Sequence, residues 1–375
     1  MASQDEKLLS FVSTVAGEGH LQVEEDLGKG FIRLRVTEAE RRQAKHDIRS
    51  VEDGIIEMLR NSRDAGSSKI FFSASKEENK FRKIVLIDDG EGIPKDYHLK
   101  IFEPRVTSRL DTVIFDKYGL HGRGLALFSL KSIVKQILVV SSLPGKGSIF
   151  KVNIDLGELP ERQDQSTFPL VKSEGTRFVV KGGVRNIPRV LTEFNLAHPE
   201  LELYFGSPTE ILRTMRYLSR ARPRDKNLAD PKTIASALEG ETFLGLLAEN
   251  GLSLWEGAGL VEDAASLKKL ANTHYGLEIS LRNAYRVARE EIKPVASLLE
   301  IAKEKQSPAK KRAESGENLA QLIPDEELAQ IGTRLKEELT AVMAKYFLRV
   351  SKEPRTLRFK NQLKVVVELE TDEDV

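Results

Sequence analysis

The chain has 375 residues, of which 40% are hydrophobic and 31% charged, and its formal net charge is +1. This length is enough for two domains, the composition is typical of a soluble globular protein, and the balanced charge gives no overall field favouring nucleic acid or membrane. The sequence contains no cysteine, which excludes disulfides, thiolate metal sites and cysteine nucleophiles.

The start of the chain is polar. Residues 1–30 lack the apolar core of a signal peptide, and no apolar run reaches the roughly 20 residues of a membrane span. We therefore expect a cytoplasmic protein whose residues 1–30 form an N-terminal arm. The six histidines show no metal-ligand spacing, which argues against a zinc site.

A strand and a long helix are expected next. Phe31–Val36 alternates apolar and basic residues, the pattern of a half-buried strand. Thr37 and Glu40 have the spacing of a capping box, which predicts that a helix begins there. Apolar residues then recur three or four positions apart until Gly66, a typical helix stop.

Polar residues on one face of this helix form the first motif. Glu57 and Asn61 are four positions apart and Asp64 follows on the same face. The Asn61 carboxamide suits Mg²⁺, which prefers oxygen ligands, and Glu57 is placed to act as a general base on water attacking a phosphate. A solvated helix face is the alternative, and for this motif alone it is the more common explanation.

Two strands and a glycine-rich turn give the second motif. Lys69–Ala74 and Lys83–Ile87 have strand composition, and the second strand runs into Asp88, Gly90 and Gly92. A carboxylate at a strand end can accept a hydrogen bond from the exocyclic amine of adenine, and glycines let the backbone approach a ligand closely. In isolation, an ordinary Asp-Gly turn explains the same residues.

A long loop and a glycine-rich turn form the third motif. Residues 103–118 lack clean periodicity, and a loop of this length often acts as a lid. Gly119, Gly122 and Gly124 then introduce a helix expected over Arg123–Gln136. Exposed amides there, together with the positive helix end, form an anion site. The spacing fits neither a Walker loop nor a Rossmann fingerprint.

Further strands follow the third motif. Ile137–Ser142 and Ser148–Leu156 are joined by a Pro-Gly turn, and Thr176–Lys181 has the composition of one more strand. Strands and helices alternate as far as about residue 205, with neighbouring strands joined by turns. We therefore expect a layered α+β domain over residues 31–205 rather than a parallel doubly wound one.

The order of the three motifs resembles the GHKL ATPase superfamily, which includes gyrase, the large heat-shock chaperone, histidine kinases and MutL. The resemblance covers residues 31 to about 182 and implies a two-layer α/β sandwich of the Bergerat type that binds ATP and Mg²⁺. It makes Glu57 the catalytic base, Asn61 the magnesium ligand and Asp88 the adenine contact. The other ATP-binding residues it implies are Asp64, Ala65, Gly90, Gly92, Ile93, Thr107, Ser108, Gly119, Leu120, His121, Gly122, Arg123, Gly124, Leu125 and Thr176.

Three segments are similar to the MutL and topoisomerase VI B branch. Asn61–Gly66 looks like the Asn-Ser-x-Asp-Ala segment of both, Thr107–Arg109 resembles the MutL lid, and Gly119–Ala126 is similar to the MutL glycine loop. Glutamate at position 57 also matches the branches that hydrolyse ATP. This branch implies an ATP-driven conformational switch that acts on DNA and forms a homodimer when it closes around the nucleotide.

A histidine-kinase-like ATP-binding protein or phosphotransferase is the alternative. His46–Arg49 resembles a phosphoacceptor box, and Ile101–Pro104 and Lys131–Val134 are similar to segments of kinase ATP domains. In kinases, however, the box lies on a separate dimerisation helix, whereas here it would share a helix with Glu57. A nucleotide-responsive binding module without turnover is a third reading.

The second half of the chain has a different pattern. Residues 206–304 are mainly helical and are expected to form a second domain, 305–320 has linker composition, and 321–375 is expected to hold a helix and a β-rich segment. One basic stretch could contact DNA phosphates, although an ion-paired surface is the more frequent explanation. Its residues are Arg213, Arg216, Arg220, Arg222, Arg224 and Lys226.

Overall fold

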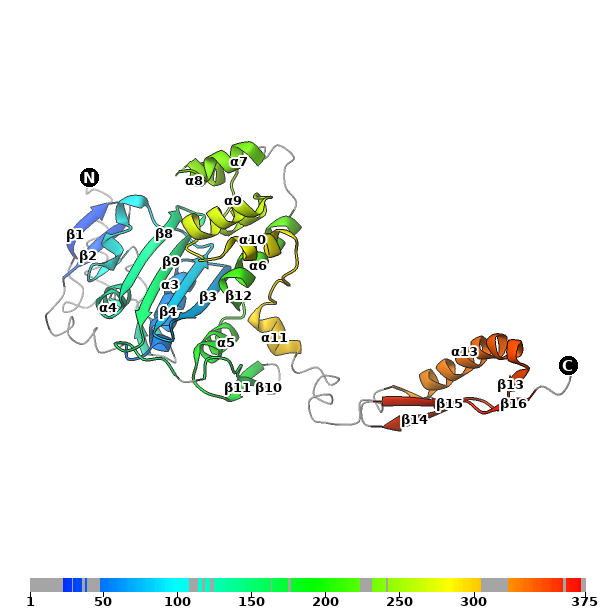
Figure 1. Ribbon diagram of the computed structural model, residues 1–375. Coiled ribbons are helices and arrows are strands. Elements are labelled where there is room, and N and C mark those ends of the chain that lie inside the picture. Colours follow the sequence, from blue (N-terminus) through cyan, green and yellow to red (C-terminus); the bar gives the residue numbers. More distant parts are fainter. Residues whose placement is uncertain are drawn as a thin grey trace, which may run out of the picture. The chain divides into compact units, whose positions relative to one another are not determined.

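The computed structural model describes most of the chain as two compact units, Met1–Glu300 and Ile301–Val375, each of which is presented by itself (Figure 1). The described residues are 23–28, 30–35, 38, 48–107, 114–116, 119–121, 125–162, 164–174, 177–222, 231–240, 242–304, 323–359 and 362–371.

A five-stranded sheet is the centre of the first unit. Its strands lie in the order β12, β3, β4, β9 and β8, and every neighbouring pair is antiparallel except β12 and β3. The sequence predicts four of these strands and misses β12, which reaches β3 only through a crossover from a distant part of the chain. The bounds are β3 Lys69–Glu77, β4 Phe81–Asp88, β8 Gln136–Leu143, β9 Gly147–Asp155 and β12 Glu202–Gly206.

Helix α3, Val51–Asp64, carries the first motif. It begins later than the sequence predicts, because Ser50 is extended (φ −147°, ψ 163°) and its side chain accepts a hydrogen bond from the Asp53 amide. Gly66 follows the helix with φ +68°, as expected for a glycine stop. Thr37 and Glu40, the predicted capping pair, lie outside the described residues.

Two helices lie beside α3, namely α4, Ala126–Ile133, and α5, Ile187–Ala197. α4 is shorter than predicted at both ends. A hairpin of β10 (Leu170–Glu174) and β11 (Arg177–Gly182) contacts α5. The remaining elements of this half are β1 Val23–Gly28, β2 Phe31–Leu34, β5 Val106–Thr107, β6 Ile114–Asp116, β7 Gly119–His121 and two short 3-10 turns, η1 Lys95–Tyr97 and η2 Lys100–Phe102.

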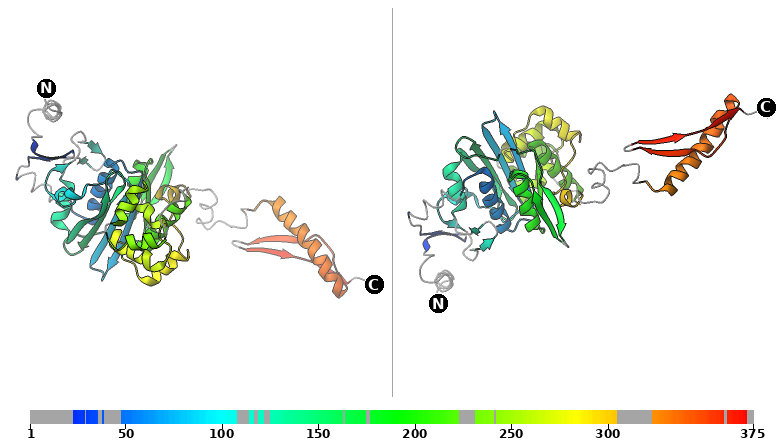
Figure 2. Two further views of the ribbon diagram at one scale, coloured as in Figure 1. Left: turned by 90° about the horizontal axis from the view of Figure 1, so that it is seen from above. Right: turned by 90° about the horizontal axis from the view of Figure 1, so that it is seen from below.

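The other face of the sheet is covered by the helices that follow residue 207, so that the sheet lies between two groups of helices (Figure 2). Side chains alternate along a strand, and Phe71, Val85 and Ile87 belong to one buried cluster with Trp255. The bounds of this group are α6 Pro208–Ala221, α7 Pro231–Ala237, α8 Thr242–Glu249, η3 Leu254–Gly259, α9 Ala264–Lys269, η4 Leu270–His274 and α10 Leu281–Ala288. Helix α11, Leu298–Glu304, follows them in the chain.

This shared core differs from the expected division of the chain. The predicted α+β sandwich and helical region are both present, but the helical region packs on the sheet instead of forming a compact unit of its own. The expected boundary at residue 205 falls inside β12, which pairs with β3 along its whole length. The sheet and the helices therefore make up one body.

The second unit contains the predicted helix and β-rich segment. Helix α13, Asp325–Met343, ends in the 3-10 turn η6, Ala344–Tyr346, and packs near antiparallel strand pairs. The strands are β13 Leu348–Val350, β14 Arg355–Phe359, β15 Gln362–Val366 and β16 Leu369–Thr371. In neither unit is a described helix both long and apolar enough to cross a membrane.

Candidate functional site

The carboxylate of Asp88 lies at the end of β4 and is only 2% exposed. The Ser62 hydroxyl, on α3, donates a hydrogen bond to it at 3.1 Å, and the Gly90 amide donates another at 3.0 Å. Burial raises the pKa of Asp88 to about 6, and these two hydrogen bonds oppose the shift. A buried carboxylate held close to its protonation point is a feature of functional sites.

The turn after Asp88 packs against the chain's own backbone. A Cβ atom at Gly92 would lie 2.1 Å from the Leu143 carbonyl oxygen, and one at Gly90 would lie 2.7 Å from that of Ala65. The Glu91 amide donates to the same Ala65 oxygen at 2.9 Å. Close approach within the protein therefore requires these glycines, in addition to any approach to a ligand.

Asn61 lies one helical turn after Glu57 on α3. Its amide nitrogen Nδ2 is buried and has no hydrogen-bond partner in the part of the chain that the structure describes. The nitrogen and oxygen of a carboxamide exchange places by rotation, so this side chain retains bonding capacity that the fold does not use. That capacity fits an oxygen ligand for Mg²⁺.

Glu57 and Asp64 are each paired with an arginine of the same helix. Nη1 of Arg60 donates to Oε1 of Glu57 at 2.5 Å, and Arg63 donates to Oδ1 of Asp64 through Nε at 2.9 Å and Nη2 at 2.7 Å. Nη1 of Arg63 also lies 3.2 Å from Nε2 of His198, beyond the end of α5. The acidic residues of the first motif are therefore fixed by neighbours on α3.

The first two motifs meet through direct hydrogen bonds, from Ser62 to Asp88 and from Glu91 to Ala65. Ser62 is not among the site residues that the sequence predicts, although it lies within the Asn-Ser-x-Asp segment that carries the resemblance. Ile93 follows the same turn, and its amide donates to the Ser142 hydroxyl at 2.6 Å.

The third motif is described in part. Thr107 belongs to β5, and Leu125 directly precedes α4. Gly119, Leu120 and His121 form β7, of which the structure describes the backbone alone. The predicted residues Ser108, Gly122, Arg123, Gly124 and Thr176 lie outside the described residues, as do His46 and Asp47 of the kinase-like box.

Residues 48–178 match a family model described as histidine kinase-, DNA gyrase B- and HSP90-like ATPase. This chain carries a GHKL ATPase domain. The chain is also similar to the DNA mismatch repair protein MutL of Staphylococcus aureus strains Newman and JH1, with 29% identity over 182 residues in each case. That region is 48% of this chain and 25% of each MutL, so the chain spans about a quarter of the length of these relatives.

The GHKL domain is therefore MutL-like, and its function is of the ATP-binding, ATPase type. The matched range includes α3, the Asp88 turn and the glycine-rich turn before α4. The predicted family is confirmed.

Two of the predicted DNA contacts are buried beside the GHKL domain. Arg213 is 5% exposed and Arg216 is 1% exposed, so the prediction that they contact DNA is wrong. Nε of Arg213 donates to the Ile292 carbonyl at 3.1 Å, and Nη1 of Arg216 donates to the Val261 carbonyl. Burial lowers the pKa of Arg216 to about 10. These arginines join α6 to the segments that pack against it.

The other basic residues of this stretch are distributed differently. Arg220 pairs with Glu262 at 2.5 Å and Arg222 with Glu256 at 2.8 Å, and both arginines remain partly exposed. Arg224 and Lys226 lie outside the described residues. The ion-paired surface, which the sequence offers as the alternative, describes Arg220 and Arg222.

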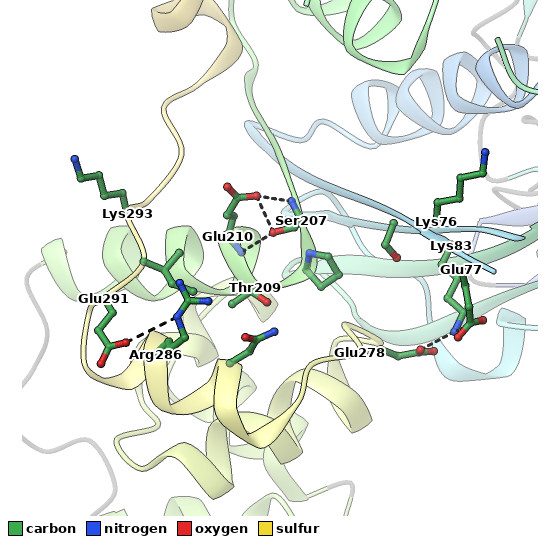
Figure 3. A pocket seen from close by; sticks show the side chains of 14 residues that line it. Lys76, Glu77, Lys83, Ser207, Thr209, Glu210, Glu278, Arg286, Glu291 and Lys293 are labelled. Atoms are coloured by element: carbon green, nitrogen blue, oxygen red, sulfur yellow. Dashed lines mark hydrogen bonds and ion pairs between the residues drawn. The ribbon is translucent and has the colours of Figure 1, made fainter. Parts of the chain in front are cut away.

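A separate cleft of about 740 Å³ lies between the sheet and the helices α6 and α10 (Figure 3). Charged side chains in the cleft form ion pairs. The Nζ atom of Lys83 lies 2.7 Å from Oε2 of Glu278 and 2.9 Å from Oε2 of Glu77. Hydrogen bonds to these two carboxylates raise the pKa of Lys83. The residues that line the cleft include none of the three motifs, so the cleft is distinct from the candidate nucleotide site.

Proposed function

We propose that the GHKL domain binds ATP together with Mg²⁺ and hydrolyses it, and that turnover drives a conformational switch. The observation that carries the proposal is the direct hydrogen bond between the first two motifs. The Ser62–Asp88 hydrogen bond ties the carboxylate for adenine to the helix that bears Glu57 and Asn61. Base recognition and phosphate chemistry would then share one rigid element.

Each residue has a separate task in this proposal. The ionised Asp88 carboxylate accepts a hydrogen bond from the exocyclic amine of adenine, and the Asn61 carboxamide gives its oxygen to the metal ion. Glu57 orients a water molecule and takes its proton. Mg²⁺, when bound, neutralises charge on the phosphates. The burial of Asp88 makes its contact with adenine specific, because an unsatisfied carboxylate there is costly.

The test is phosphate release by the full chain with Mg-ATP, beside Glu57→Gln. Glutamine keeps the hydrogen bond with Arg60 but cannot accept a proton, so turnover should fall by about 100-fold or more while ATP binding persists. Normal turnover by Glu57→Gln would remove the role given to Glu57. Radiolabel from [γ-³²P]ATP retained on the protein, in place of released phosphate, would favour the phosphotransferase alternative.

The likeness to MutL supports a further part of the proposal, namely that the switch acts on DNA and closes as a homodimer. These relatives are DNA mismatch repair proteins by name. Phosphate release should rise when duplex DNA is added, and the sedimentation coefficient should increase with a non-hydrolysable ATP analogue. If duplex DNA leaves turnover unchanged and the ATP analogue leaves the sedimentation coefficient unchanged, a protein partner is the next candidate.

A further inference from the structure

Arg60 is a buried cation in the middle of the first motif. Its side chain is 3% exposed, whereas that of Glu57, with which it pairs, is 23% exposed. The two residues are three positions apart on α3, which places them on adjacent turns of one face. A guanidinium cannot lose its proton in the interior, so its charge has to be matched by a nearby anion.

The pairing also acts on Glu57. A positive charge in direct contact favours the ionised form of a carboxyl group, typically by about 1 to 3 pH units. The hydrogen bond at 2.5 Å holds one carboxylate oxygen in a fixed direction. Because Arg60 is the more buried partner, the geometry of the pair is set from inside the protein and not by solvent.

We propose that Arg60 is a positioning residue for Glu57. It keeps the carboxylate ionised and fixed on α3, and by the same contact it makes Glu57 a weaker base. This inference rests on the proposed function for the catalytic role of Glu57, but the pairing itself is a property of the protein without nucleotide. Arg60 thereby sets the lower pH limit of turnover.

The first test is a titration of Glu57 in the nucleotide-free full chain. Glutamate labelled with ¹³C at Cδ gives one signal for each side chain, and the Glu57 signal is the one that disappears in Glu57→Gln. In Arg60→Gln the midpoint of this signal should move up by about 1 to 2 pH units, and in Arg60→Lys it should stay near the wild-type value. Should Arg60→Gln fail to fold, Arg60→Met keeps the apolar stem and removes the charge.

A matched control is available on α5. Arg189 pairs with Glu193 at 2.8 Å within that helix, and the pair belongs to none of the motifs. Arg189→Gln should leave the Glu57 midpoint unchanged. An equal shift in Arg189→Gln would mean that general loss of charge, and not the contact with Arg60, moves the titration, and would overturn the inference.

The second test is the pH profile of phosphate release. The acid limb should move up by the same amount in Arg60→Gln as the midpoint does, and Arg60→Lys should restore it. Identical Glu57 midpoints in wild type and Arg60→Gln would overturn the inference. A shifted midpoint with an unshifted acid limb would overturn the catalytic part of it. If the midpoint shifts in Arg60→Gln but the wild-type protein shows no turnover, the proposed hydrolysis is removed and the pairing of Arg60 with Glu57 stands.

Discussion

The buried polar residues on the two faces of the central sheet make different contacts. On the side of α3, buried positions include the carboxylate of Asp88, the hydroxyl of Ser62 and the guanidinium of Arg60. On the side of α6, the core is formed mainly by large apolar side chains such as Trp255 and Phe243. The buried arginines on that side, Arg213 and Arg216, donate to backbone carbonyl oxygens. The residues on the α6 side join segments of the fold, whereas the three polar residues on the α3 side lie in or beside the motifs of the candidate nucleotide site.

This difference separates function from stability within one unit. Buried polar groups cost free energy unless they are paired, and Asn61 keeps an amide nitrogen without a partner in the described part of the chain. Buried polar groups without a partner are found mainly where they have a function. The burial of apolar side chains supplies the free energy that offsets their cost. Changes on the two faces should therefore affect different measurements.

The largest expected effect comes from the apolar face. Trp255→Ala removes a fully buried side chain that packs against Phe71 at a ring distance of 5.4 Å. The free energy of unfolding should fall by about 3 to 5 kcal/mol, measured by urea denaturation. ATP affinity measured on the folded protein at low temperature should be unchanged. A loss of affinity as large as the loss of stability would show that the two faces are not separable.

The next effect comes from the titration of Asp88. Its pKa is raised from 3.8 to about 6, so the folded chain holds this proton more tightly than the unfolded chain. Stability is therefore lost as the pH rises from about 4 to 6, and the full cost is present above pH 6. In Asp88→Asn this dependence should vanish. The difference in unfolding free energy between variant and wild type should change by about 2 to 3 kcal/mol from pH 4 to pH 7, in favour of the variant. A constant difference across this range would contradict the raised pKa.

Asn61→Ala tests the polar face directly. Mg-ATP affinity, measured by titration calorimetry, should fall by about 10- to 100-fold, because a ligand to a charged group is lost. Stability should change little, since the Asn61 amide nitrogen makes no hydrogen bond with the described residues. A large loss of stability with unchanged affinity would assign Asn61 to the fold and not to the site.

The smallest effect is expected at the surface of α6. Arg220 is 32% exposed and pairs with Glu262, so Arg220→Gln should lower the unfolding free energy by less than about 1 kcal/mol. If Arg220 contacts a DNA phosphate, the affinity of Arg220→Gln for duplex DNA should fall alike for all sequences. The slope of the logarithm of the binding constant against the logarithm of the salt concentration should decrease in magnitude by about one. Arg282→Gln, on the exposed side of α10, is the control. Equal losses in both variants would indicate a general charge effect.

The sequence places three motif residues on the elements where the structure has them, Glu57 and Asn61 on α3 and Asp88 at the end of β4, because the relevant relations are local. Glu57, Asn61 and Asp88 stand at positions set by helical spacing and by a strand end. The start of α3 was mispredicted because the apolar periodicity continues through Ile48, although Ser50 followed by Asp53 has the composition of an N-cap. The N-cap at Ser50 is a local signal for the helix start, whereas the longer apolar periodicity predicts an earlier start.

Other features depend on distant contacts. Ile84–Ile87 is a continuous apolar run, which is typical of a strand covered on both faces. No local pattern, however, tells which helices cover the second face. The burial of Arg216 depends on the Val261 carbonyl, and of Arg213 on the Ile292 carbonyl. In the sequence alone, these arginines are indistinguishable from exposed ones on an amphipathic helix.

The contact between the Asp88 turn and the β8–β9 turn also restricts which substitutions this part of the chain can accept. A Cβ atom would lie 2.1 Å from a carbonyl oxygen at Gly92 and 1.9 Å from one at Gly147, and both residues have positive φ. Gly182 and Gly240, in contrast, have open space around them. In a saturation mutagenesis library, positions 92 and 147 should therefore accept glycine alone, while positions 182 and 240 should accept many other residues. Such a library would mark the Asp88 turn by its intolerance of even a single methyl group.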